Sequence, residues 1–589
     1  CSKQNNSLAP SDRSHFGSSQ ACGPMEVQAS APAWDVIVVG AGAAGLACSR
    51  VLSAAGLRTL LLEARDRCGG RAWSWDALGL GVELDLGGAW LQSACAGNPV
   101  FRLAKERGLE LLEDTTDTSF VADVRAGRLL DRKALKPYYC AVEEALGKVE
   151  STCNADEGEG MEGRSEEGSG RLGEQDGSAN MTMMQALLSQ GLPLHPEGQP
   201  EAGNGRGGRR KARKGQRKFD AHILRWALAW LLELDEGTSA EGLSALQLGA
   251  NLPETNVVPV GGYGAFVRSL IKGPLGQVEA GEASLPQLEL NVAVRRVEME
   301  DSTLRSVRVH TEGGEVHCAQ RVIIAVPLGV LKAGAIDFSP PLPQRKLDAI
   351  EHLGCANMAK VFLRFPRCFW KDEVSGWSIC GLPVDQPESV FERAWFFPYP
   401  LRPCDVPDGE GVLCILLCGQ AARDLERLSD EAASAAAVKA LRTAAGCDGA
   451  KQFFVEPSGK LPEPTAVSLS RWHLDPWSLC CWTAFKPGSS AADCSALAEP
   501  LGERRWMGFA GEHTTADDMG TVHGAFLTGL REAEGVLLAC MEDGCFASGK
   551  AMVRAARWLL YCRDALAAAR AVREHDEECD SDSSSSSSS

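Results

Sequence analysis

The chain has 589 residues, a length that allows roughly two to four domains and a large buried core. Apolar residues make up 44% and charged residues 23% of the sequence, which excludes a mostly disordered chain, a collagen and a multi-span membrane protein. The formal charge of −18 argues against broad binding to phosphate backbones and is compatible with a cationic substrate.

Both ends of the chain and one internal segment lack a core-forming pattern. Residues 1–33 are rich in Ser, Gln and Ala, so we expect a flexible leader. Residues 151–218 begin acidic and end basic, which predicts a low-complexity loop insertion with one short helix near 181–190. The basic run is typical of a solvated loop, with a nuclear-localisation or polyanion-binding patch as the alternative. We also predict an extra helix over 549–573 and a disordered acidic and poly-Ser tail over 574–589.

The cysteines indicate a reducing compartment. All 22 are scattered without a paired C-x-x-C spacing, so no metal site is predicted. A chain of this length does not need disulfides, and many cysteines lie in apolar segments, so we interpret them as mostly buried thiols. We therefore expect an intracellular protein of the cytoplasm or nucleus, with an organelle left open because the sequence does not begin with Met. No apolar run is long enough to span a bilayer.

A strand, a glycine-rich turn and a helix open the patterned region. Residues 35–39 (DVIVV) are typical of a buried parallel strand, and a helix is predicted over 43–55. Between them, Gly40, Gly42 and Gly45 form the pattern G-x-G-x-x-G. Gly40 permits the tight turn, Gly42 lets a pyrophosphate approach the N–H groups of the helix N-terminus, and Gly45 lets helix and strand pack closely.

Two glycine-rich segments that follow the second strand favour FAD over NAD. Residues 58–62 form a strand that ends at Glu63, whose carboxylate can accept hydrogen bonds from two ribose hydroxyls. This order of elements predicts a dinucleotide site without choosing between FAD and NAD. The segments EARDRCGGR (63–71) and VELDLGGAW (82–90) follow, and a simple NAD domain needs neither.

Several separate motifs then carry a family resemblance. They are EARDRCGGR, VVPVGGYGAF (257–266), RVIIAVPLGVL (321–331), DFSPPLPQRK (337–346), AKVFLRFPRCFW (359–370), SRWHLDPW (470–477) and GFAGEHTTADDMGTVHGAFLTGLREA (508–533). With these motifs the sequence resembles the flavin-dependent amine oxidases, which include polyamine oxidases, monoamine oxidases and flavin-type lysine-specific histone demethylases. The likeness covers about residues 34–543 without the insertion, and its last two motifs are most similar to the demethylase and polyamine-oxidase branches.

The resemblance implies an α/β fold of two interleaved domains. A Rossmann-like FAD-binding domain is expected to take segments of about 34–100, 256–335 and 500–543. A substrate domain with a mixed sheet and helices is expected to take segments of about 101–150, 219–255 and 336–499.

The resemblance also implies the residues that contact FAD. Val294 resembles the residue beside the adenine, Glu512 the acid near the ribityl–pyrophosphate region, and a helix is expected over 525–538. The predicted cofactor-binding residues are Gly40, Gly42, Ala44, Gly45, Glu63, Arg65, Gly70, Arg71, Gly87, Ala89, Trp90, Val294, Glu512, Thr521 and Val522. We expect FAD to be bound non-covalently. The alternative is a thioether to Cys481, because SLCCWTAF resembles the monoamine-oxidase segment that carries such a link.

Lys360 is the predicted catalytic residue. It lies in the alternating apolar stretch MAKVFLRF, where burial of a lysine is costly. In the family the matching lysine reaches the flavin N5 atom through a water. The alternative is an outward-facing strand residue such as Arg364.

The predicted substrate residues are Trp482, Trp472, Gln92 and Thr521. Trp482 takes the position where relatives usually have Tyr, and Thr521 takes the opposite position of the aromatic slot, which favours the polyamine or methyl-lysine branches. Trp472 is equally well explained as a core tryptophan. Gln92 stands where polyamine oxidases often have His or Glu, which weakens the expectation of a polyamine.

The function implied by the resemblance is that of an FAD-dependent oxidase. It would oxidatively deaminate a polyamine-like amine with O2 and release an aldehyde, an amine and H2O2. The expected partners are a small cationic amine or a lysine-containing protein tail, and O2; nucleic acid is not expected apart from the basic loop. Asp517 and Asp518 would either attract the amine at the entrance or form a solvated loop. A methyl-lysine demethylase, a catalytically altered flavoprotein scaffold and an NAD-dependent dehydrogenase stay open as alternatives.

Overall fold

The computed structural model of the protein describes most of the chain between residues 33 and 586. The described ranges are 33–114, 117–158, 180–194, 219–245, 256–272, 285–299, 306–399, 406–407, 409–456, 460–502, 504–546 and 548–586. The predictions of a flexible leader and of a basic loop therefore lie outside the described residues, apart from Ala33. No helix in the described part of the chain combines the length and the apolar character that a membrane crossing needs.

A mixed sheet forms around the first predicted strand. Within the described residues it has eight strands in the order β13-β10-β11-β12-β1-β2-β9, with β21 also paired to β12. The central strands β1 (Trp34–Val39), β2 (Thr59–Leu62) and β12 (Val316–Ile324) run parallel. Parallel strands are buried on both faces, which explains their continuous apolar sequence. The other strands are β9 (Gln287–Glu289), β10 (Val294–Met299), β11 (Val307–Thr311), β13 (Asp337–Ser339) and β21 (Met507–Phe509).

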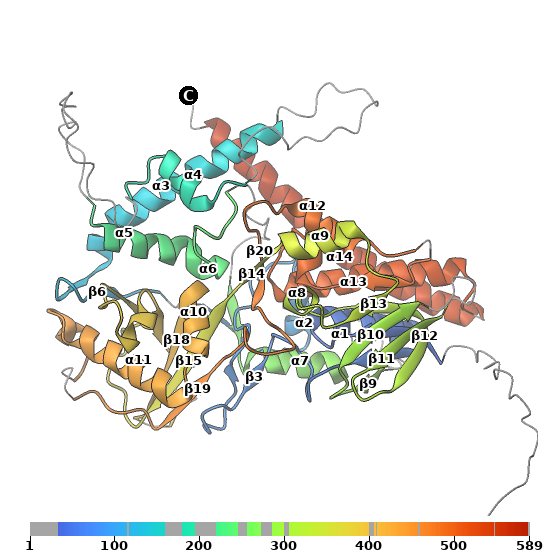
Figure 1. Ribbon diagram of the computed structural model, residues 1–589, viewed down its shortest axis with the longest axis horizontal. Helices are drawn as coiled ribbons and strands as arrows, with labels where there is room; N and C mark the ends of the chain where they lie inside the picture. Colours follow the sequence, from blue (N-terminus) through green and yellow to red (C-terminus); the bar gives the residue numbers. More distant parts are fainter. Residues whose placement is uncertain are drawn as a thin grey trace, which may run out of the picture.

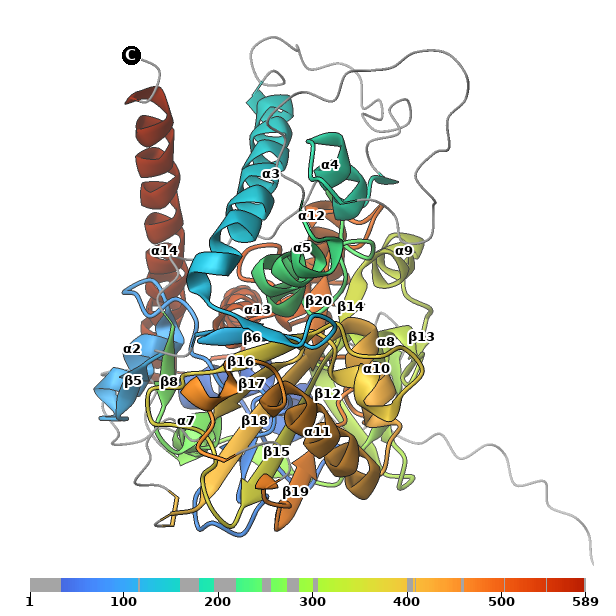
Figure 2. The same ribbon diagram turned by 90° about the vertical axis from the view of Figure 1, so that its left-hand side faces the viewer.

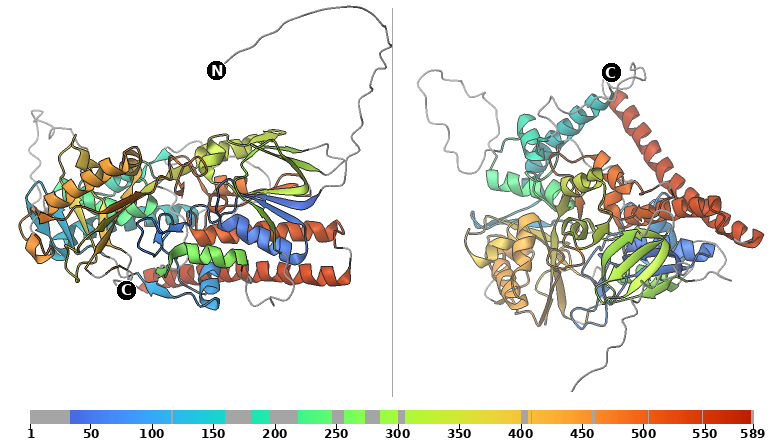
Figure 3. Two further views of the ribbon diagram at one scale, coloured as in Figure 1. Left: turned by 90° about the horizontal axis from the view of Figure 1, so that it is seen from below. Right: turned by 45° about the vertical axis from the view of Figure 1, so that its right-hand side comes forward.

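A layer of helices covers one face of this sheet (Figure 3, left). It contains α1 (Ala43–Ala55), α7 (Gly262–Lys272), α13 (Val522–Glu542) and α14 (Gly549–Ser586). Helix α1 spans the predicted residues, and α13 is longer than predicted at both ends. Helix α14 continues past residue 573, where the sequence predicts its end, into an acidic segment that contains the good helix former Glu.

The second large sheet lies beside the first (Figure 1). Within the described residues it has seven strands in the order β19-β15-β18-β17-β16-β6-β7. Helices α10 (Gly419–Glu426) and α11 (Asp430–Ala445) pack against it through small and apolar side chains. The strands are β6 (Phe120–Asp123), β7 (Arg128–Leu130), β15 (Met358–Phe365), β16 (Trp377–Cys380), β17 (Trp395–Pro398), β18 (Gly411–Cys418) and β19 (Ala466–Leu469).

The two sheets draw on alternating stretches of the chain. The first uses strands from residues 34–62, 287–339 and 507–509, and the second uses strands from 120–130, 358–418 and 466–469. The predicted α/β class with mixed sheets and helices is confirmed. The shorter connecting elements are β3 (Ser74–Trp75), β4 (Leu84–Asp85), α2 (Pro99–Glu106), β5 (Leu111–Glu113), β8 (Val257–Pro259), α8 (Leu328–Lys332), α9 (Gln344–His352), β14 (Gly354–Ala356), β20 (Trp482–Ala484), α12 (Ala491–Ala498) and the 3₁₀ turn η7 (Glu512–Thr514).

A helical group lies across one end of the second sheet (Figure 2). It comprises α3 (Arg132–Gly158), α4 (Met183–Ser189), α5 (Ala221–Leu228), the π-helix η2 (Ala229–Glu233) and α6 (Leu234–Glu236). Helix α4 forms where the sequence predicts a short helix, and a capping box between Thr182 and Gln185 starts it. Met183 and Leu187 are fully buried in one cluster with Trp226. This part of the insertion therefore packs into the core.

Replacing Leu187 with Ala should destabilise the protein. The side chain is fully buried, so its loss leaves a cavity, and we expect the free energy of unfolding to fall by about 2–5 kcal/mol. Chemical denaturation monitored by tryptophan fluorescence measures the change. Ser189→Ala, an exposed position on the same helix, is the control and should change stability little. Equal, small effects of both substitutions would show that α4 does not pack.

Candidate functional site

A cavity of about 820 Å³ lies where the two sheets meet. The first sheet contributes Val39, Leu62 and Val294, and the second contributes Lys360 and Leu416. The volume is at the upper end of the ~300–1,000 Å³ range of small-molecule sites. All residues that the sequence predicts to contact cofactor or substrate line this cavity, except Gly45. Their individual roles stay predictions.

The glycine-rich turn after β1 borders one end of the cavity. Gly40 has a φ of +102°, a conformation that favours glycine, and a Cβ on Gly45 would lie 1.9 Å from the carbonyl oxygen of Gly40. Gly42, in contrast, has no atom within 4 Å of the place where a Cβ would be. It is also the N-cap of α1 and brings no side-chain cap. The N-terminus of α1 therefore faces open space with backbone N–H groups that suit an anionic pyrophosphate.

Glu63 fixes this turn to the end of β2. Its buried carboxylate accepts hydrogen bonds from the backbone N–H of Ala41 at 2.7 Å and of Arg65 at 2.9 Å. Each oxygen thus uses one of its two acceptor positions. The remaining acceptor positions suit the two ribose hydroxyls that the sequence assigns to this acid.

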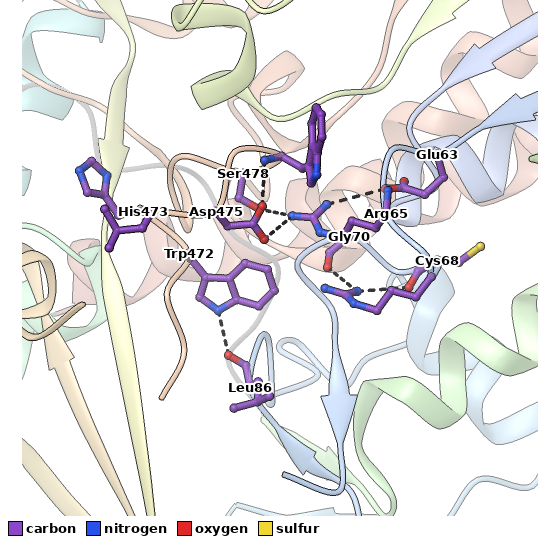
Figure 4. Close-up of polar contacts among 12 residues, drawn as sticks. Glu63, Arg65, Cys68, Gly70, Leu86, Trp472, His473, Asp475 and Ser478 are labelled. Carbon is purple, nitrogen blue, oxygen red and sulfur yellow. Dashed lines mark hydrogen bonds and ion pairs between the residues drawn. The ribbon is translucent and has the colours of Figure 1, made fainter. Parts of the chain in front are cut away.

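The two predicted cofactor arginines also bind other segments of the protein. Figure 4 shows Arg65 between the glycine-rich segment and the 470–478 segment, where it donates to Asp475 at 2.8 Å and to Ser478 at 2.7 Å. Arg71 donates to the carbonyl oxygen of Cys481 at 2.8 Å and forms an ion pair of 3.0 Å with Glu512. Both arginines belong to the glycine-rich segment 63–71. Their contacts therefore hold the part of the cavity wall formed by residues 475–481 and Glu512 against that segment.

Glu512 joins two further segments to Arg71. Its buried carboxylate accepts from the N–H and hydroxyl of Thr483, both at 3.1 Å, and from the N–H of Gly520 at 3.2 Å. Burial acts to raise the pKa of Glu512, but the positive charge of Arg71 and the hydrogen bonds outweigh it and lower the pKa. The carboxylate therefore stays charged at the cavity wall.

Lys360 points into the cavity from β15. Its Nζ donates to the carbonyl oxygens of Asp85 at 2.9 Å and Gly87 at 2.6 Å, and lies 5.4 Å from the ring centroid of Trp90. Burial lowers the pKa of this amine. Arg364, further along the same strand, instead pairs with Glu410. The geometry therefore favours a Lys360 that faces the cavity over the alternative of an exposed strand residue.

Asp85 is a buried carboxylate that the sequence reasoning missed. It accepts from Ser74 and from the N–H of Tyr263 through one oxygen and from the Tyr399 hydroxyl through the other. Burial raises the pKa of Asp85 to about 6. These bonds fix the segment whose carbonyl oxygens hold Lys360. A charged residue between the apolar Leu84 and Leu86 was the signal in the sequence.

The predicted slot residues form part of the cavity wall. Trp482 on β20 packs between two glycines: a Cβ would lie 2.5 Å from its ring at Gly237 and 2.8 Å at Gly520. Trp472 is buried, lines the cavity and donates its indole N–H to the carbonyl oxygen of Leu86 at 2.8 Å (Figure 4). It therefore serves as core and wall at once. Gln92 is exposed and also borders the cavity.

Three further tryptophans in the wall, Trp230, Trp395 and Trp477, were not predicted as site residues. Trp395 on β17 stacks on Trp90, with ring centroids 6.2 Å apart and an interplanar angle of 17°. Trp230 meets Trp395 edge-on at 5.4 Å. Trp230 lies in the π-helix η2, a feature that is frequent at functional sites. A π-helix depends on backbone hydrogen bonding, so the sequence pattern gave no sign of it.

Acidic side chains line the same cavity at the helical group. They are Glu150, Asp235 and Glu236 of that group, and Asp114, which follows β5, also lines the cavity. The pKa of Glu236 is raised to about 7, first by burial and then by the negative charge of Asp235. A bound cation would stabilise the ionised form of Glu236, so this wall favours a positively charged ligand.

Both expectations are wrong for Asp518, whereas Asp517 is exposed, as the solvated-loop expectation has it. Neither residue lines the cavity, and Asp518 is fully buried, paired with His523 and Arg573. An entrance or a solvated loop is therefore excluded for Asp518. The nearby Thr521 accepts from the N–H of Gly524 and caps α13, which is why the helix begins at Val522 and not at 525.

Comparison with known proteins identifies relatives over most of the chain. A family model described as flavin containing amine oxidoreductase matches residues 43–537. Lysine-specific histone demethylase 1 homolog 3 of Oryza sativa subsp. indica is 31% identical over 510 residues, covering 85% of this chain and 54% of that protein. Polyamine oxidase 2 of Arabidopsis thaliana is 29% identical over 520 residues, covering 86% of this chain and 89% of that protein.

A solved structure also has a similar fold. Wild-type putrescine oxidase bound to putrescine matches with a TM-score of 0.60 at 20% identity, covering 86% of this chain and 99% of that one. The chain spans about half the length of the histone demethylases it matches. The predicted family resemblance is confirmed by these matches.

Glu63→Ala should weaken flavin binding. The substitution removes a charged acceptor at the end of β2, so we expect the affinity for FAD to fall by roughly tenfold to a hundredfold. Titration of the apoprotein with FAD, followed by flavin fluorescence, measures the affinity. Glu83→Ala, which removes an ion pair with Arg268 outside the cavity, should leave it unchanged. A Glu63→Ala protein with unaltered affinity would contradict the assignment.

Proposed function

The chain belongs to the flavin-containing amine oxidoreductase family, and from this membership we propose that it is an oxidase of a polyamine-like amine. It is an oxidoreductase with FAD as its cofactor. The proposed reaction consumes an amine, O2 and water, and it releases an aldehyde, a smaller amine and H2O2.

One observation carries the proposal. The cavity that is bordered by the glycine-rich turn after β1 is also lined by the buried Lys360, by tryptophans and by acidic side chains. An aromatic wall binds the alkyl chain of an amine, and carboxylates such as Asp235 and Glu236 attract its ammonium groups. These features supply binding and orientation around a flavin.

A bound flavin would supply the two-electron chemistry, namely acceptance of a hydride equivalent from the carbon beside the amine nitrogen and its transfer to O2. Lys360 has three donor positions, and the carbonyl oxygens of Asp85 and Gly87 use two. The third position suits a water in the cavity. Because burial lowers its pKa, the amine of Lys360 loses this third proton more readily, and the lone pair left at that position can then take a proton from the water. Such a water would hydrolyse the imine product.

A methyl-lysine demethylase is the second candidate. It is favoured by the histone demethylases among the relatives, which are about as similar to this chain as the polyamine oxidases are. The acidic, aromatic cavity suits a lysine side chain on the same physical grounds. If the protein acts on histones, we propose that it works in the nucleus.

A panel of amines tests the proposal. The purified holoprotein is mixed in air-saturated buffer with di- and polyamines, their acetylated forms, monoamines and methylated lysine peptides, and H2O2 release is followed. We expect the highest kcat/KM for a di- or polyamine. Peroxide and formaldehyde from methylated peptides alone would favour the demethylase. Peroxide from none of them would favour the flavoprotein scaffold.

Lys360→Met should reduce turnover without loss of flavin. Methionine keeps most of the side-chain volume but removes the amine, so turnover of the best amine should fall at least about tenfold. The flavin absorbance per protein should stay the same. Arg364→Met is the matched control, because Arg364 lies on the same strand and pairs with Glu410. Unchanged turnover in the Lys360 variant would show a structural role only.

FAD should be released from the protein by acid. The Cys481 thiol donates to the carbonyl oxygen of Met358 at 3.1 Å, and burial raises its pKa to about 12, so it stays protonated and a poor nucleophile. We therefore propose non-covalent binding. Precipitation of the holoprotein with trichloroacetic acid should leave the flavin in the supernatant. A yellow pellet that yields a flavin-labelled Cys481 peptide would contradict this.

A further inference from the structure

A tight turn before α13 forms part of the cavity wall. Met519, Gly520, Thr521 and Val522 all line the cavity. The turn is held from within by the carbonyl oxygen of Asp518, which accepts from the N–H and the hydroxyl of Thr521. Asp518 has a φ of +53°, which is costly for a residue with a side chain. Such a conformation persists where surrounding contacts hold it.

The contacts that hold Asp518 come from its carboxylate. One oxygen lies 3.2 Å from Nε2 of His523, and the other accepts from the guanidinium of Arg573. The carboxylate is fully buried, so without a partner it would be strongly unfavourable. Burial acts to raise the pKa of Asp518, but the hydrogen bond to His523 and the charge of Arg573 outweigh it and lower the pKa. Arg573 supplies the permanent positive charge of this pair.

Arg573 lies on α14, far along the chain from the turn. Helix α14 packs along α13 and α1 before it reaches this point (Figure 3). Its Val572 also packs closely on Gly97, where a Cβ would lie 3.0 Å from the valine. Gln92 and Ser93, a few residues before Gly97, line the cavity as well. The same part of α14 therefore supports two segments that border the cavity.

The family model ends at residue 537, so the whole of α14 lies outside the matched residues. We propose that α14 is a clamp on the cofactor site, in which Arg573 acts as a positioning residue by fixing Asp518 and, through it, the 519–522 turn. The clamp makes flavin retention in this protein depend on a helix that the family pattern does not include.

The physical consequence of losing the ion pair follows from burial. Without Arg573, Asp518 must take up a proton or move toward water, and either change releases the turn that its carbonyl oxygen holds. The N-terminus of α13 then loses its fixed position beside the cavity. Flavin affinity should fall while most of the protein, which packs elsewhere, stays folded.

The test compares two arginines of α14. Arg573→Ala removes the buried pair with Asp518, whereas Arg563→Ala removes a more exposed pair between α14 and α13, with Glu534, neither member of which lines the cavity. FAD release from the holoprotein is followed by the gain in flavin fluorescence, and unfolding by circular dichroism. We expect Arg573→Ala to speed release at least about tenfold below its melting temperature. Arg563→Ala should release FAD like the parent protein.

Two further variants separate charge from packing. Arg573→Lys keeps the charge and should recover part of the retention. In Asp518→Asn, release should also speed up. Adding Arg573→Ala should change it little further, because the proposed effect of Arg573 on the turn passes through Asp518 and not through its second, exposed partner Asp517. If Arg573→Ala does not fold, the double variant Asp518→Asn with Arg573→Met, which removes both charges, is measured in its place.

Unchanged release in these variants would overturn the proposal, as would equal acceleration by Arg563→Ala, which would indicate general loosening of α14. Hydrogen exchange of the amides at 519–524 gives a second readout, since it should rise in Arg573→Ala and stay unchanged in Arg563→Ala. No amine is used in these measurements. Their outcome therefore does not depend on whether the proposed oxidase activity is right.

Discussion

The carboxylate of Glu512 is the point on which the cavity wall depends. It binds Arg71 of the glycine-rich segment, Thr483 beside Trp482, and the N–H of Gly520 before α13. These segments are far apart in the sequence. A buried charge whose oxygens meet four donors has few alternative arrangements, so this one acid sets the relative positions of the segments around the cavity.

The parts of the site that the sequence predicts are those with local causes. The turn of Gly40, Gly42 and Gly45 follows from the close approach of backbone atoms within one strand–helix unit, so spacing alone indicates it. Lys360 could be singled out because a lysine among apolar strand residues needs an unusual environment. The extent of α1 followed from its small-residue pattern and from Gly56 at its end.

The parts that the sequence does not predict depend on contacts between distant segments. In the sequence Asp518 looks like one of two neighbouring exposed acids. Its environment in the structure depends on Arg573, which lies on a helix outside the residues that the family model matches. Asp85 stands out in the sequence only as a charge between apolar residues, and its role depends on the hydrogen bonds that it accepts from Tyr263 and Tyr399 of other segments. Trp230 and Trp395 look like core residues by type, and only their position across the cavity gives them another use. For helix α4 the sequence predicts the helix but not its burial, because the helix lies in a segment whose composition indicates a loop.

The buried lysine, which is predicted to be catalytic, and the acidic wall, which favours a cation, line the same cavity as the glycine-rich turn after β1. The central claim is therefore that an amine in this cavity delivers electrons to the flavin. Anaerobic mixing of the holoprotein with a di- or polyamine, followed by absorbance near 450 nm, tests it most directly, since neither O2 nor product release enters the signal. The account predicts bleaching of the flavin band by the amine and its return on admission of O2. A band that dithionite bleaches but no amine or methylated lysine peptide affects would contradict the account.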